Sequence, residues 1–597
     1  MLMKRVYDAI IIGSGAAAYG VADRLHKLGV KNIALIAENR LSGTSRNTGS
    51  DKQTYYKLSL DGLSQDSPYR MANDIFASGC CDGEKMYIQA VNSAECFLRL
   101  CDYGVNFPKD EFGGYPGYKT DHDNTVRATS VGPLTSKIMT EKLEKVVLEK
   151  NRTPFYDNRQ VVEILKDGDN TAGVAVLNTE TDEFECFYSY NVICATGAPA
   201  CIYENSVYPH SQHGMTGVLI DAGVRLCNFS QWQYGMSSVD FRWNVSGSFM
   251  QVVPRFVSVD ENGCEYEFLN EYFADTGEMC SNIFLKGYQW PFSYERAGKS
   301  SRIDIAVHNE TSKGRRVYLD FTRNPKGFSF DALSDEARDY LEKNGATALK
   351  PIDRLNILNP KAIAVYSAQG IDLYTGMLRI AVCAQHNNGG VYTDNNWETD
   401  VKGLYVIGEA AGTFGLARPG GTALNDTQVS GLVCARHISK KGVSLCNFEV
   451  TDDYFKKYGD FTEDETVDYS YIKKEMSRCA AFLRDEEKCR DLLCTVNKIL
   501  SAYPKRHRSL SAYFYDRDML TSAKALLETI IGEMPLTGSR GGAVFRAKGK
   551  TVDEDISYRK YLTVTENGKV CFEEVKPVPV SDKPFEKYLN EVSYEQL

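Results

Sequence analysis

Long hydrophobic runs and closely spaced cysteine pairs are both missing from this 597-residue sequence. No apolar stretch approaches the roughly 18–20 residues that a membrane-spanning helix needs, so we expect no membrane span. The 17 cysteines contain no C-x-x-C pair, which excludes the common zinc and iron–sulfur motifs, and we predict no metal site. Most cysteines lie among apolar residues, as in Val192-Ile193-Cys194, which is typical of small buried side chains in a reducing compartment. We therefore expect a cytoplasmic protein, since the N-terminus also carries no signal-peptide pattern.

An excess of positive charge is also lacking. The chain has 69 lysines and arginines against 79 aspartates and glutamates, a formal net charge of −10. Because a phosphate-binding surface needs clustered basic residues, nucleic acid is excluded as the main partner. The length corresponds to about two to four domains. The hydrophobic content of 43% and the charged content of 25% are ordinary for a globular enzyme.

The N-terminal residues carry a dinucleotide-binding pattern. An apolar run at 7–12 (YDAIII) predicts a buried parallel strand, and the turn GSGAAA follows it. Gly13 allows the tight turn, Gly15 lets the backbone approach a pyrophosphate, and Ala18 permits close packing of the next helix. A second strand leads to Glu38, where a carboxylate can accept hydrogen bonds from ribose hydroxyls.

A second glycine-rich stretch, 403–424 (GLYVIGEAAGTFGLARPGGTAL), lies in the last third of the chain. An apolar strand leads into Gly408-Glu409, and a loop ends at Arg418-Pro419-Gly420-Gly421 before residues that favour a helix. Glycines before a helix N-terminus leave backbone N–H groups for an anionic or electron-rich ligand, although the stretch could also be purely structural. Two such stretches far apart in one chain indicate a long cofactor, and FAD is favoured over NAD.

These motifs, in this order, resemble those of the flavoprotein subunits of fumarate reductase and succinate dehydrogenase, a family that includes L-aspartate oxidase. The matching segments extend from residue 7 to about residue 546. They are the GSGAAA turn, Ala195-Thr196-Gly197, His213-Gly214, Asp221-Ala222-Gly223, the segment 385–390 (QHNNGG), the Arg418 loop and Ser539-Arg540-Gly541. Each segment is short, and the specificity of the resemblance lies in their order and spacing.

The resemblance implies an α/β protein with a Rossmann-like FAD-binding domain, an inserted α+β capping domain and a C-terminal helical bundle. On this basis the FAD-binding domain is expected at 1–234 and 370–440, and the capping domain at 235–369. The helical domain is expected at 441–550, where apolar residues recur with helical spacing, and a charged tail follows at 551–597.

The resemblance also implies which residues hold FAD. The segment 42–53 (SGTSRNTGSDKQ) would lie against the flavin ring, unless it is only a polar surface loop. Family members with covalent FAD carry a histidine there, whereas this chain has none between His26 and His122, so non-covalent binding is predicted. The expected cofactor-binding residues are Gly13, Ser14, Gly15, Ala17, Ala18, Glu38, Thr44, Ser45, Thr48, Gly49, Ser50, Thr196, Gly197, Gly408, Glu409, Gly420, Gly421, Ala423 and Leu424.

Two substrate-binding histidines of the family are replaced in this sequence. The family's Gln-Phe-His-Pro segment corresponds to 231–234 (QWQY), which puts Gln233 at the histidine position. The family's His-Tyr-Thr-Met-Gly-Gly segment corresponds to 385–390, which puts Gln385 at the second histidine position and His386 beside it. A glutamine can bond a carbonyl, hydroxyl or amide but brings no charge, and a histidine at 386 could be structural or functional.

Two arginines are candidates for the chemistry. Arg418 directly precedes the glycine pair, where the family has an arginine that clamps a substrate carboxylate. A guanidinium fork binds a carboxylate bidentately and stays charged, although Arg418 could instead pair with an internal acid. The family also uses a cap-domain arginine as proton donor, and Arg302 in the segment 301–306 (SRIDIA) is the nearest match. Arg255 and Arg296 are rivals for this role, and a surface or salt-bridged arginine is the other interpretation.

The sequence therefore predicts an FAD oxidoreductase that reduces, or forms, an activated C=C bond beside a carboxylate or carbonyl. Arg418 would orient the substrate, Arg302 would deliver the proton, and the polar end would be bound by Gln233, Gln385 and His386. The changed histidine positions indicate an unsaturated acid other than fumarate. Two alternatives stay open: an amino-acid oxidase like L-aspartate oxidase, and a subunit that only relays electrons in a complex. No haem, iron–sulfur or fused flavin motif is present, so the electron donor or acceptor would be external.

Overall fold

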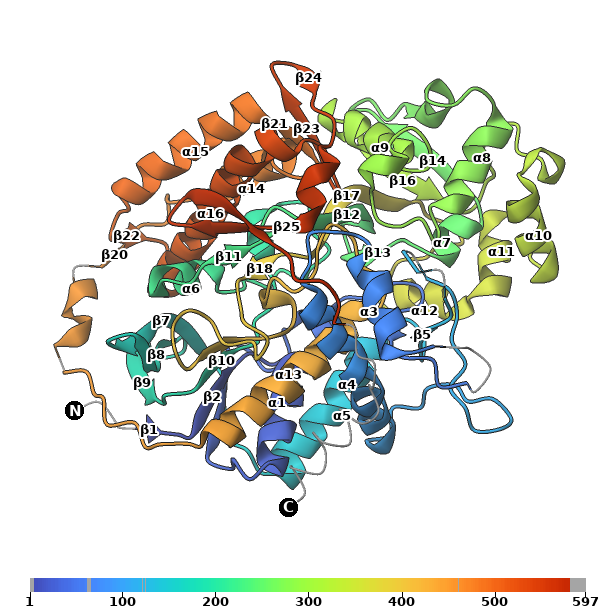
Figure 1. Cartoon of the computed structure of the whole chain (residues 1–597). Helices are drawn as coiled ribbons and strands as arrows, with labels where there is room; N and C mark the ends of the chain where they lie inside the picture. Colours follow the sequence, from blue (N-terminus) through green and yellow to red (C-terminus); the bar gives the residue numbers. More distant parts are fainter. Residues whose placement is uncertain are drawn as a thin grey trace.

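A five-stranded parallel sheet organises the larger core of the protein in the computed structural model (Figure 1). The structure describes residues 5–61, 66–120, 122–123, 125–451, 453–459 and 461–579. The strand order is β19 (Leu404–Val406), β10 (Val192–Cys194), β2 (Ala9–Ile12), β3 (Ile33–Ile36) and β6 (Phe155–Tyr156). Every residue of β2, β3, β10 and β19 is buried, which explains why these segments are continuous apolar runs in the sequence.

Helices cover this sheet, and two neighbouring helices come from segments far apart in the sequence. α1 (Ala16–Lys27) packs along α13 (Thr422–Lys441). Gly431 permits the close approach, because a Cβ there would lie 3.1 Å from the backbone nitrogen of Val21. The two glycine motifs of the chain are thereby held side by side. The other helices around this core are α2 (Thr44–Asn47), α3 (Pro68–Phe76), α4 (Gly83–Asp102), α5 (Thr135–Lys145) and α6 (Thr216–Ala222).

The segment between β6 and β10 forms three strands of a four-stranded mixed sheet, and β1 (Arg5–Val6) is the fourth strand. The order of this sheet is β1, β9 (Glu183–Tyr188), β8 (Asn170–Asn178) and β7 (Arg159–Asp167). The three long strands pair antiparallel, and only the short β1 runs parallel to its neighbour. After β9 the chain returns to the central sheet as β10, directly beside β2.

Residues 236–380 build a second hydrophobic core around a six-stranded sheet. Its order is β13 (Trp243–Asn244), β12 (Trp232–Ser238), β17 (Leu378–Asn387), β16 (Arg316–Asp320), β14 (Arg255–Val259) and β15 (Glu265–Tyr266). The accompanying helices are α7 (Ser248–Gln251), α8 (Thr276–Leu285), α9 (Arg302–Ser312), α10 (Asp335–Lys343), α11 (Pro351–Leu358) and α12 (Pro360–Ser367). In Figure 1 most of these elements gather at the upper right. β12 and β17 contribute residues to both cores, so the two cores share this strand pair.

The C-terminal third adds a helical layer, coloured orange to red in Figure 1. Its helices are α14 (Ser470–Cys479), α15 (Glu486–Ser501) and α16 (Leu510–Thr537). α16 buries one apolar stripe, Met519, Leu520, Ala523, Leu526, Leu527 and Ile530. Four small sheets complete the fold of the described residues. One contains β21 (Leu483–Asp485), β23 (Val544–Ala547) and β24 (Lys550–Thr551), and another contains β18 (Gly390–Val391), β11 (Leu226–Cys227), β25 (Tyr561–Glu566) and β26 (Lys569–Glu574). The other two are the pairs β20 (Thr462–Glu463) with β22 (Arg506–His507) and β4 (Tyr55–Tyr56) with β5 (Ala128–Thr129).

The predicted fold class is confirmed: an α/β core built on a parallel sheet, an inserted α+β layer and a C-terminal helical bundle are all present. The domain boundaries stay a prediction, because β12 and β17 belong to both cores. The predicted tail contains the hairpin β25–β26, and its residues 580–597 lie outside the described part of the chain. Among the described residues, no helix combines the length and the apolar character that crossing a membrane requires.

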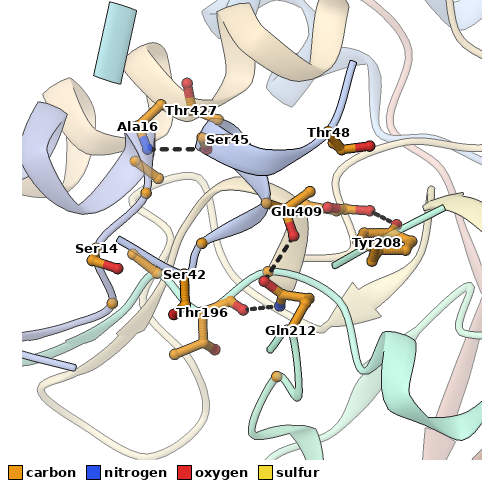
Figure 2. A pocket seen from close by; sticks show the side chains of 18 of the residues that line it. Ser14, Ala16, Ser42, Ser45, Thr48, Thr196, Tyr208, Gln212, Glu409 and Thr427 are labelled. Carbon is orange, nitrogen blue, oxygen red and sulfur yellow. Dashed lines mark hydrogen bonds between the residues drawn. The ribbon is translucent and has the colours of Figure 1, made fainter. Parts of the chain in front are cut away.

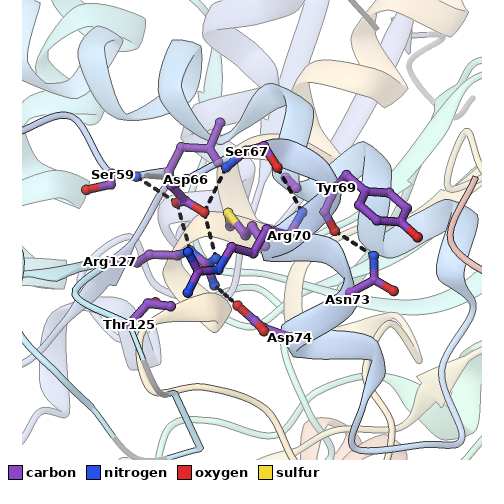
Figure 3. Close-up of polar contacts among 12 residues, drawn as sticks. Ser59, Asp66, Ser67, Tyr69, Arg70, Asn73, Asp74, Thr125 and Arg127 are labelled. Carbon is purple, nitrogen blue, oxygen red and sulfur yellow. Dashed lines mark hydrogen bonds and ion pairs between the residues drawn. The ribbon is translucent and has the colours of Figure 1, made fainter. Parts of the chain in front are cut away.

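Arg127 anchors a long loop between α4 and α5. Its guanidinium is fully buried and bonds Asp66 through two nitrogens, at 2.7 and 2.8 Å, and Asp74 at 2.7 Å (Figure 3). Burial alone would raise the pKa of Asp66. The hydrogen bond from Arg127, the hydrogen bonds from the backbone N–H groups of Ser59 and Ser67, and the charge of Arg127 together outweigh burial, so the pKa is lowered. The same loop carries Tyr118 and Lys119 to the wall of a cavity.

We predict that Arg127→Ala destabilises the protein by about 3–5 kcal/mol, because it leaves the buried Asp66 carboxylate without its partner. The measurement is chemical denaturation followed by intrinsic fluorescence. Arg338→Ala is the control, since its partner Asp335 is 90% exposed and such pairs contribute less than about 1 kcal/mol. Equal stability of the two variants would contradict an anchoring role for Arg127.

Candidate active site

Two cavities lie next to each other and share one wall. The first, of about 280 Å³, is lined by the turns that follow β2, β10 and β19. The second, of about 600 Å³, is lined by the end of β17, the Arg418 loop and elements of the second core. A ligand in the first cavity that reaches the shared wall would therefore face a ligand in the second. The residues lining both cavities are Ser50, Gln53, Asn244, Gln385, His386, Ala423 and Leu424.

The turn after β2 forms one end of the first cavity. Gly13 has a φ of +126°, and a Cβ there would lie 2.5 Å from the Ala195 carbonyl oxygen, so only glycine fits. α1 begins at Ala16 without a side-chain cap and without an acid in its first turn, so its positive end is available to an anion. The Ala16 backbone N–H donates to Ser45 Oγ at 3.1 Å, which holds the segment 42–53 over this turn (Figure 2). A pyrophosphate needs such a cradle.

Glu38 also lines the first cavity. The Tyr515 hydroxyl donates to Glu38 Oε2 at 2.5 Å, and the Tyr515 ring stacks on His213 with centroids 4.0 Å apart. Burial raises the pKa of Glu38 to about 7, while the hydrogen bond from Tyr515 acts in the opposite direction. A carboxyl group with one donor bound keeps acceptor capacity for the hydroxyls of a ribose.

The turn after β10 and the segment 42–53 meet in the first cavity (Figure 2). Thr44 Oγ1 donates to Gln212 Oε1 at 2.8 Å, and Gln212 Nε2 donates to the Thr196 carbonyl at 2.5 Å. The Thr196 hydroxyl is buried and has no hydrogen-bond partner among the described residues. A buried hydroxyl without a partner in a cavity wall can be satisfied by a bound ligand. The glycine cradle, the acid at Glu38 and this hydroxyl together fit an FAD molecule.

Glu409 follows β19 and links the first cavity to the shared wall. It accepts a hydrogen bond from the Tyr208 hydroxyl (Figure 2) and another, at 3.0 Å, from the Asn387 backbone N–H. Its Oε1 lies 3.9 Å from His386 Nε2. Burial raises the pKa of Glu409 to about 7, and the hydrogen bonds and the charge of Arg418 only partly oppose this rise.

A β-bulge brings two adjacent side chains of β17 to the cavities. In a regular strand, neighbouring residues point to opposite faces of the sheet. Here Gln233 of β12 pairs with His386, and the next pair is Tyr234 with Ala384, so Gln385 is the extra residue of the bulge. Gln385 and His386 consequently both line the shared wall.

Arg418 and His386 form a hydrogen bond at the second cavity. Arg418 Nε lies 3.3 Å from His386 Nδ1, and Asn388 Oδ1 lies 3.2 Å from the same nitrogen. Because a guanidinium keeps its protons, Nδ1 accepts from Arg418, and the imidazole proton sits on Nε2. Burial, and then the charge of Arg418, lower the pKa of His386 well below its ordinary value, so the ring is neutral. Nε2 has no hydrogen-bond partner among the described residues and can donate to a ligand.

The structure brings most of the predicted site residues together. The four predicted substrate-binding residues all line the second cavity: Gln233, Gln385, His386 and Arg418. All of the predicted cofactor-binding residues line one cavity or the other, except Ala18 and Gly408. Ala18 is buried where α1 packs on the sheet, and Gly408 is buried with a φ of +62° in the turn after β19.

Arg302 is the predicted residue that the structure does not bring to the site. It begins α9, donates through Nη1 to the Tyr272 carbonyl at 2.8 Å, and lies over the Phe273 ring. It lines neither of the two cavities, so the geometry does not support the proton-donor role expected for it. Of its rivals, Arg255 is held by three carboxylates, and Arg296 lines a neighbouring cavity of about 480 Å³.

Several wall residues were not predicted from the sequence, because their segments carry no recognisable motif. Gln212 directly precedes the His213-Gly214 segment, and this position was the one signal that could have identified it. The others come from strands, loops and helices of the second core or from the segment before it: Tyr208, Asn244, Tyr288, Trp290 and Tyr340.

We predict that Gly13→Ala yields protein with little bound FAD, because the added Cβ collides with the Ala195 carbonyl and opens the turn. The measurement is the FAD released on denaturation per mole of protein. Gly29→Ala is the matched control: Gly29 also has a positive φ, of +87°, but a Cβ there meets nothing within 4 Å. This control should retain FAD, and equal FAD loss in both variants would contradict the cradle.

The raised pKa of Glu409 predicts a pH dependence of stability. The ordinary value is 4.5 and the folded value is about 7, so between them the folded protein keeps a proton that the unfolded chain releases. The contribution of Glu409 to stability is therefore present at low pH and is lost as the pH rises through about 7. The unfolding temperature of Glu409→Gln should fall less between about pH 5 and about pH 8 than that of the wild type. Asp335→Asn, an exposed control, should follow the wild-type curve.

Comparison with known proteins agrees with this geometry. Residues 8–424 match the family described as FAD binding domain. The chain is 25% identical over 493 residues to a subunit of the fumarate reductase (CoM/CoB) of Methanothermobacter marburgensis, covering 79% of each chain. It is 21% identical over 453 residues to L-aspartate oxidase 2 of Ralstonia nicotianae, covering 74% of each chain. The solved structure of Mycobacterium smegmatis Sdh1 in complex with UQ1 has the same fold, with a TM-score of 0.74 at 16% identity, covering 99% of this chain and 98% of that chain.

The family match extends over most of the chain and ends at Leu424, which lines both cavities. It includes the glycine turn at Gly13, the turn at Thr196 and Glu409, which together form the first cavity. The predicted cofactor is therefore confirmed as FAD. The chain belongs to the FAD binding domain family and is an FAD-dependent oxidoreductase of the fumarate reductase and L-aspartate oxidase group.

Proposed function

We propose that this protein reduces, or in the reverse direction forms, a C=C bond that is activated by an adjacent carboxylate or carbonyl. The observation that carries the proposal is the position of Arg418 and His386, which line a cavity that shares a wall with the FAD cavity. FAD, when bound, accepts or donates the hydride. A substrate carboxylate on Arg418 would set the distance between the double bond and the shared wall.

The surroundings of Arg418 support a role in orienting the substrate. Nε bonds His386, Nη1 lies 3.4 Å from Thr422 Oγ1, and the guanidinium lies 5.8 Å from the centroid of the Phe414 ring. These contacts fix the plane of the guanidinium. A carboxylate that binds to a fixed guanidinium is held in one orientation, which is how positioning lowers a reaction barrier.

The neutral donors beside Arg418 would act on the substrate oxygen. When a hydride adds to the carbon far from the activating group, negative charge develops on the carbonyl or carboxylate oxygen. His386 Nε2–H and the side-chain amide N–H groups of Gln233 and Gln385 are hydrogen-bond donors on this wall, and donors aimed at such charge stabilise the transition state. A proton is then taken up by the carbon next to the activating group.

We infer that the substrate is not fumarate. His386 is neutral, and both positions where the family has substrate-binding histidines are glutamines. Arg418 is the one arginine on the described wall of the second cavity, and the two lysines there, Lys52 and Lys119, have exposed side chains. A small dicarboxylate would thus have one strong partner in a cavity of about 600 Å³, which suits a larger monoacid.

An amino-acid oxidase is the second candidate, and the similarity to L-aspartate oxidase favours it. In that case the same wall would hold an amino acid, and oxygen would accept the electrons. In both versions FAD is held non-covalently, because the segment 42–53 offers no histidine and Thr44 is engaged by Gln212. The electron donor or acceptor is external to the chain in both versions.

The test is anaerobic photoreduction of the holoprotein, followed by addition of α,β-unsaturated acids while the flavin spectrum is recorded. Reoxidation by one of these acids within seconds, and not by fumarate, would support the proposal. Rapid reoxidation of the reduced flavin by air, seen as the return of its absorbance, with no response to any acid, would favour the oxidase instead.

Arg418→Lys should raise the apparent Kd of the reactive acid roughly tenfold to a hundredfold, because a lysine keeps the charge but loses the bidentate fork. Arg436→Lys, on the outer part of the neighbouring helix α13, should leave that Kd unchanged. An unaltered Kd in Arg418→Lys would contradict the carboxylate-binding role.

A further inference from the structure

The second core gives the substrate cavity an aromatic wall. Phe284, Tyr288 and Tyr340 line this cavity. The Phe284 ring centroid lies 5.3 Å from that of Tyr340 and 6.1 Å from that of Tyr288, with interplanar angles of 64° and 82°. Aromatic rings prefer such edge-to-face contacts, and three rings joined in this way form one continuous apolar surface.

Hydrogen bonds within the wall engage the polar ends of these tyrosines. The Tyr340 hydroxyl donates to Gln251 Oε1 at 3.1 Å, and the Tyr288 hydroxyl bonds Glu336. Gln251 and Glu336 line the same cavity. With the hydroxyl groups engaged, the rings are what these tyrosines offer to a ligand.

Trp290 joins the aromatic wall to the wall that faces FAD. Its indole Nε1 donates to Gln385 Oε1 at 2.7 Å, and Gln385 Nε2 donates to Ser237 Oγ at 3.3 Å. The indole packs so closely on β12 that a Cβ at Gly235 would lie 2.7 Å from the ring. The aromatic surface therefore begins next to the residue of the bulge.

The other charged side chains of this cavity do not compete with Arg418 for a ligand carboxylate. Asp51 is buried and accepts from the Ser248 backbone N–H at 2.7 Å and from its hydroxyl at 2.9 Å. Glu336 is engaged by Tyr288. Lys52 and Lys119 have exposed side chains, where a carboxylate would remain in contact with water. The chemistry of the wall is thus one guanidinium, neutral amide and imidazole donors, and an aromatic surface.

We propose that the substrate is an α,β-unsaturated carboxylate with an aromatic ring on its β-carbon. The carboxylate binds Arg418, and the ring packs against Trp290, Tyr288 and Tyr340, while the buried Phe284 supports the two tyrosines. This inference rests on the function proposed above. In the reaction the C=C bond gains a hydride at the carbon that bears the ring and a proton, taken from water, at the carbon beside the carboxylate. The hydride carries the two electrons of reduced FAD, which an external reductant has reduced beforehand.

The experiment compares three acids on the oxidised holoprotein: (E)-3-phenylpropenoate, (E)-but-2-enoate and fumarate. Binding is read as the perturbation of the flavin absorbance, which reports a Kd without turnover. The aromatic acid should bind at least about tenfold more tightly than but-2-enoate, because burial of the ring adds apolar contact area. The same acid should also reoxidise the photoreduced flavin fastest.

Two variants of Tyr340 distinguish a contact between its ring and the ligand from a structural role of this residue. Tyr340→Ala removes a ring of the wall, and Tyr340→Phe keeps the ring while it removes the hydroxyl. In Tyr340→Ala the preference for the aromatic acid should fall several-fold, while the Kd of but-2-enoate stays within about twofold of the wild-type value. Tyr340→Phe should keep the wild-type preference. If the role of Tyr340 were purely structural, Tyr340→Ala would instead raise the Kd of both acids by the same factor.

The outcomes distinguish this inference from the proposed function. If but-2-enoate or fumarate binds as tightly as the aromatic acid and reoxidises the flavin as fast, the aromatic assignment is overturned and the C=C reductase stands. If no unsaturated acid perturbs the spectrum or reoxidises the flavin, the proposed function itself is overturned. If both Tyr340 variants lost the same binding affinity for all three acids, the aromatic assignment would also be overturned.

Discussion

The parallel pairing of three strands is the constraint on which the cofactor site depends. β2, β10 and β19 are neighbours and run in the same direction, so their carboxyl ends meet at one edge of the sheet. The turns that leave this edge carry Gly13, Thr196 and Glu409, which come from widely separated parts of the sequence. Burial of the strands on both faces fixes their register, and the register fixes the distances between the turns. The packing of α1 on α13 then holds the two glycine motifs together.

The bulge at Gln385 is a second constraint, and it connects the cofactor site to the second cavity. A regular β17 would turn either Gln385 or His386 away from the cavities, whereas the extra residue lets both line the shared wall. Because β12 and β17 belong to both hydrophobic cores, the same strand pair also positions the second core over the site. The Trp290 indole donates a hydrogen bond to Gln385, so the aromatic wall is joined directly to the wall that the two cavities share.

Burial shifts His386, Glu38 and Glu409 toward their uncharged forms, whereas Arg418 stays charged. The pKa of His386 is lowered, and the pKa values of Glu38 and Glu409 are raised to about 7. A neutral imidazole can donate a hydrogen bond without attracting a second carboxylate. Arg418 keeps its proton in any environment, so it brings a fixed charge to the second cavity, next to His386 of the shared wall. In the function proposed above, the cavity would therefore bind one carboxylate and leave the remainder of the ligand to apolar contacts.

The sequence by itself determined the dinucleotide-binding pattern and the positions of the two glycine motifs, because these depend on local patterns: apolar strands, glycine turns and helical periodicity. The order of its motifs, through their resemblance to a known family, gave the fold class and FAD. The same resemblance made Arg418 a candidate, since the family has an arginine directly before this glycine pair. Only the tertiary structure decided that Arg302 points to the Tyr272 carbonyl and not into the cavity, because the direction of a side chain at a helix start depends on what packs around it. The aromatic wall was likewise decided by packing between segments without a motif, in which an aromatic residue of the wall and one of the core look the same in sequence.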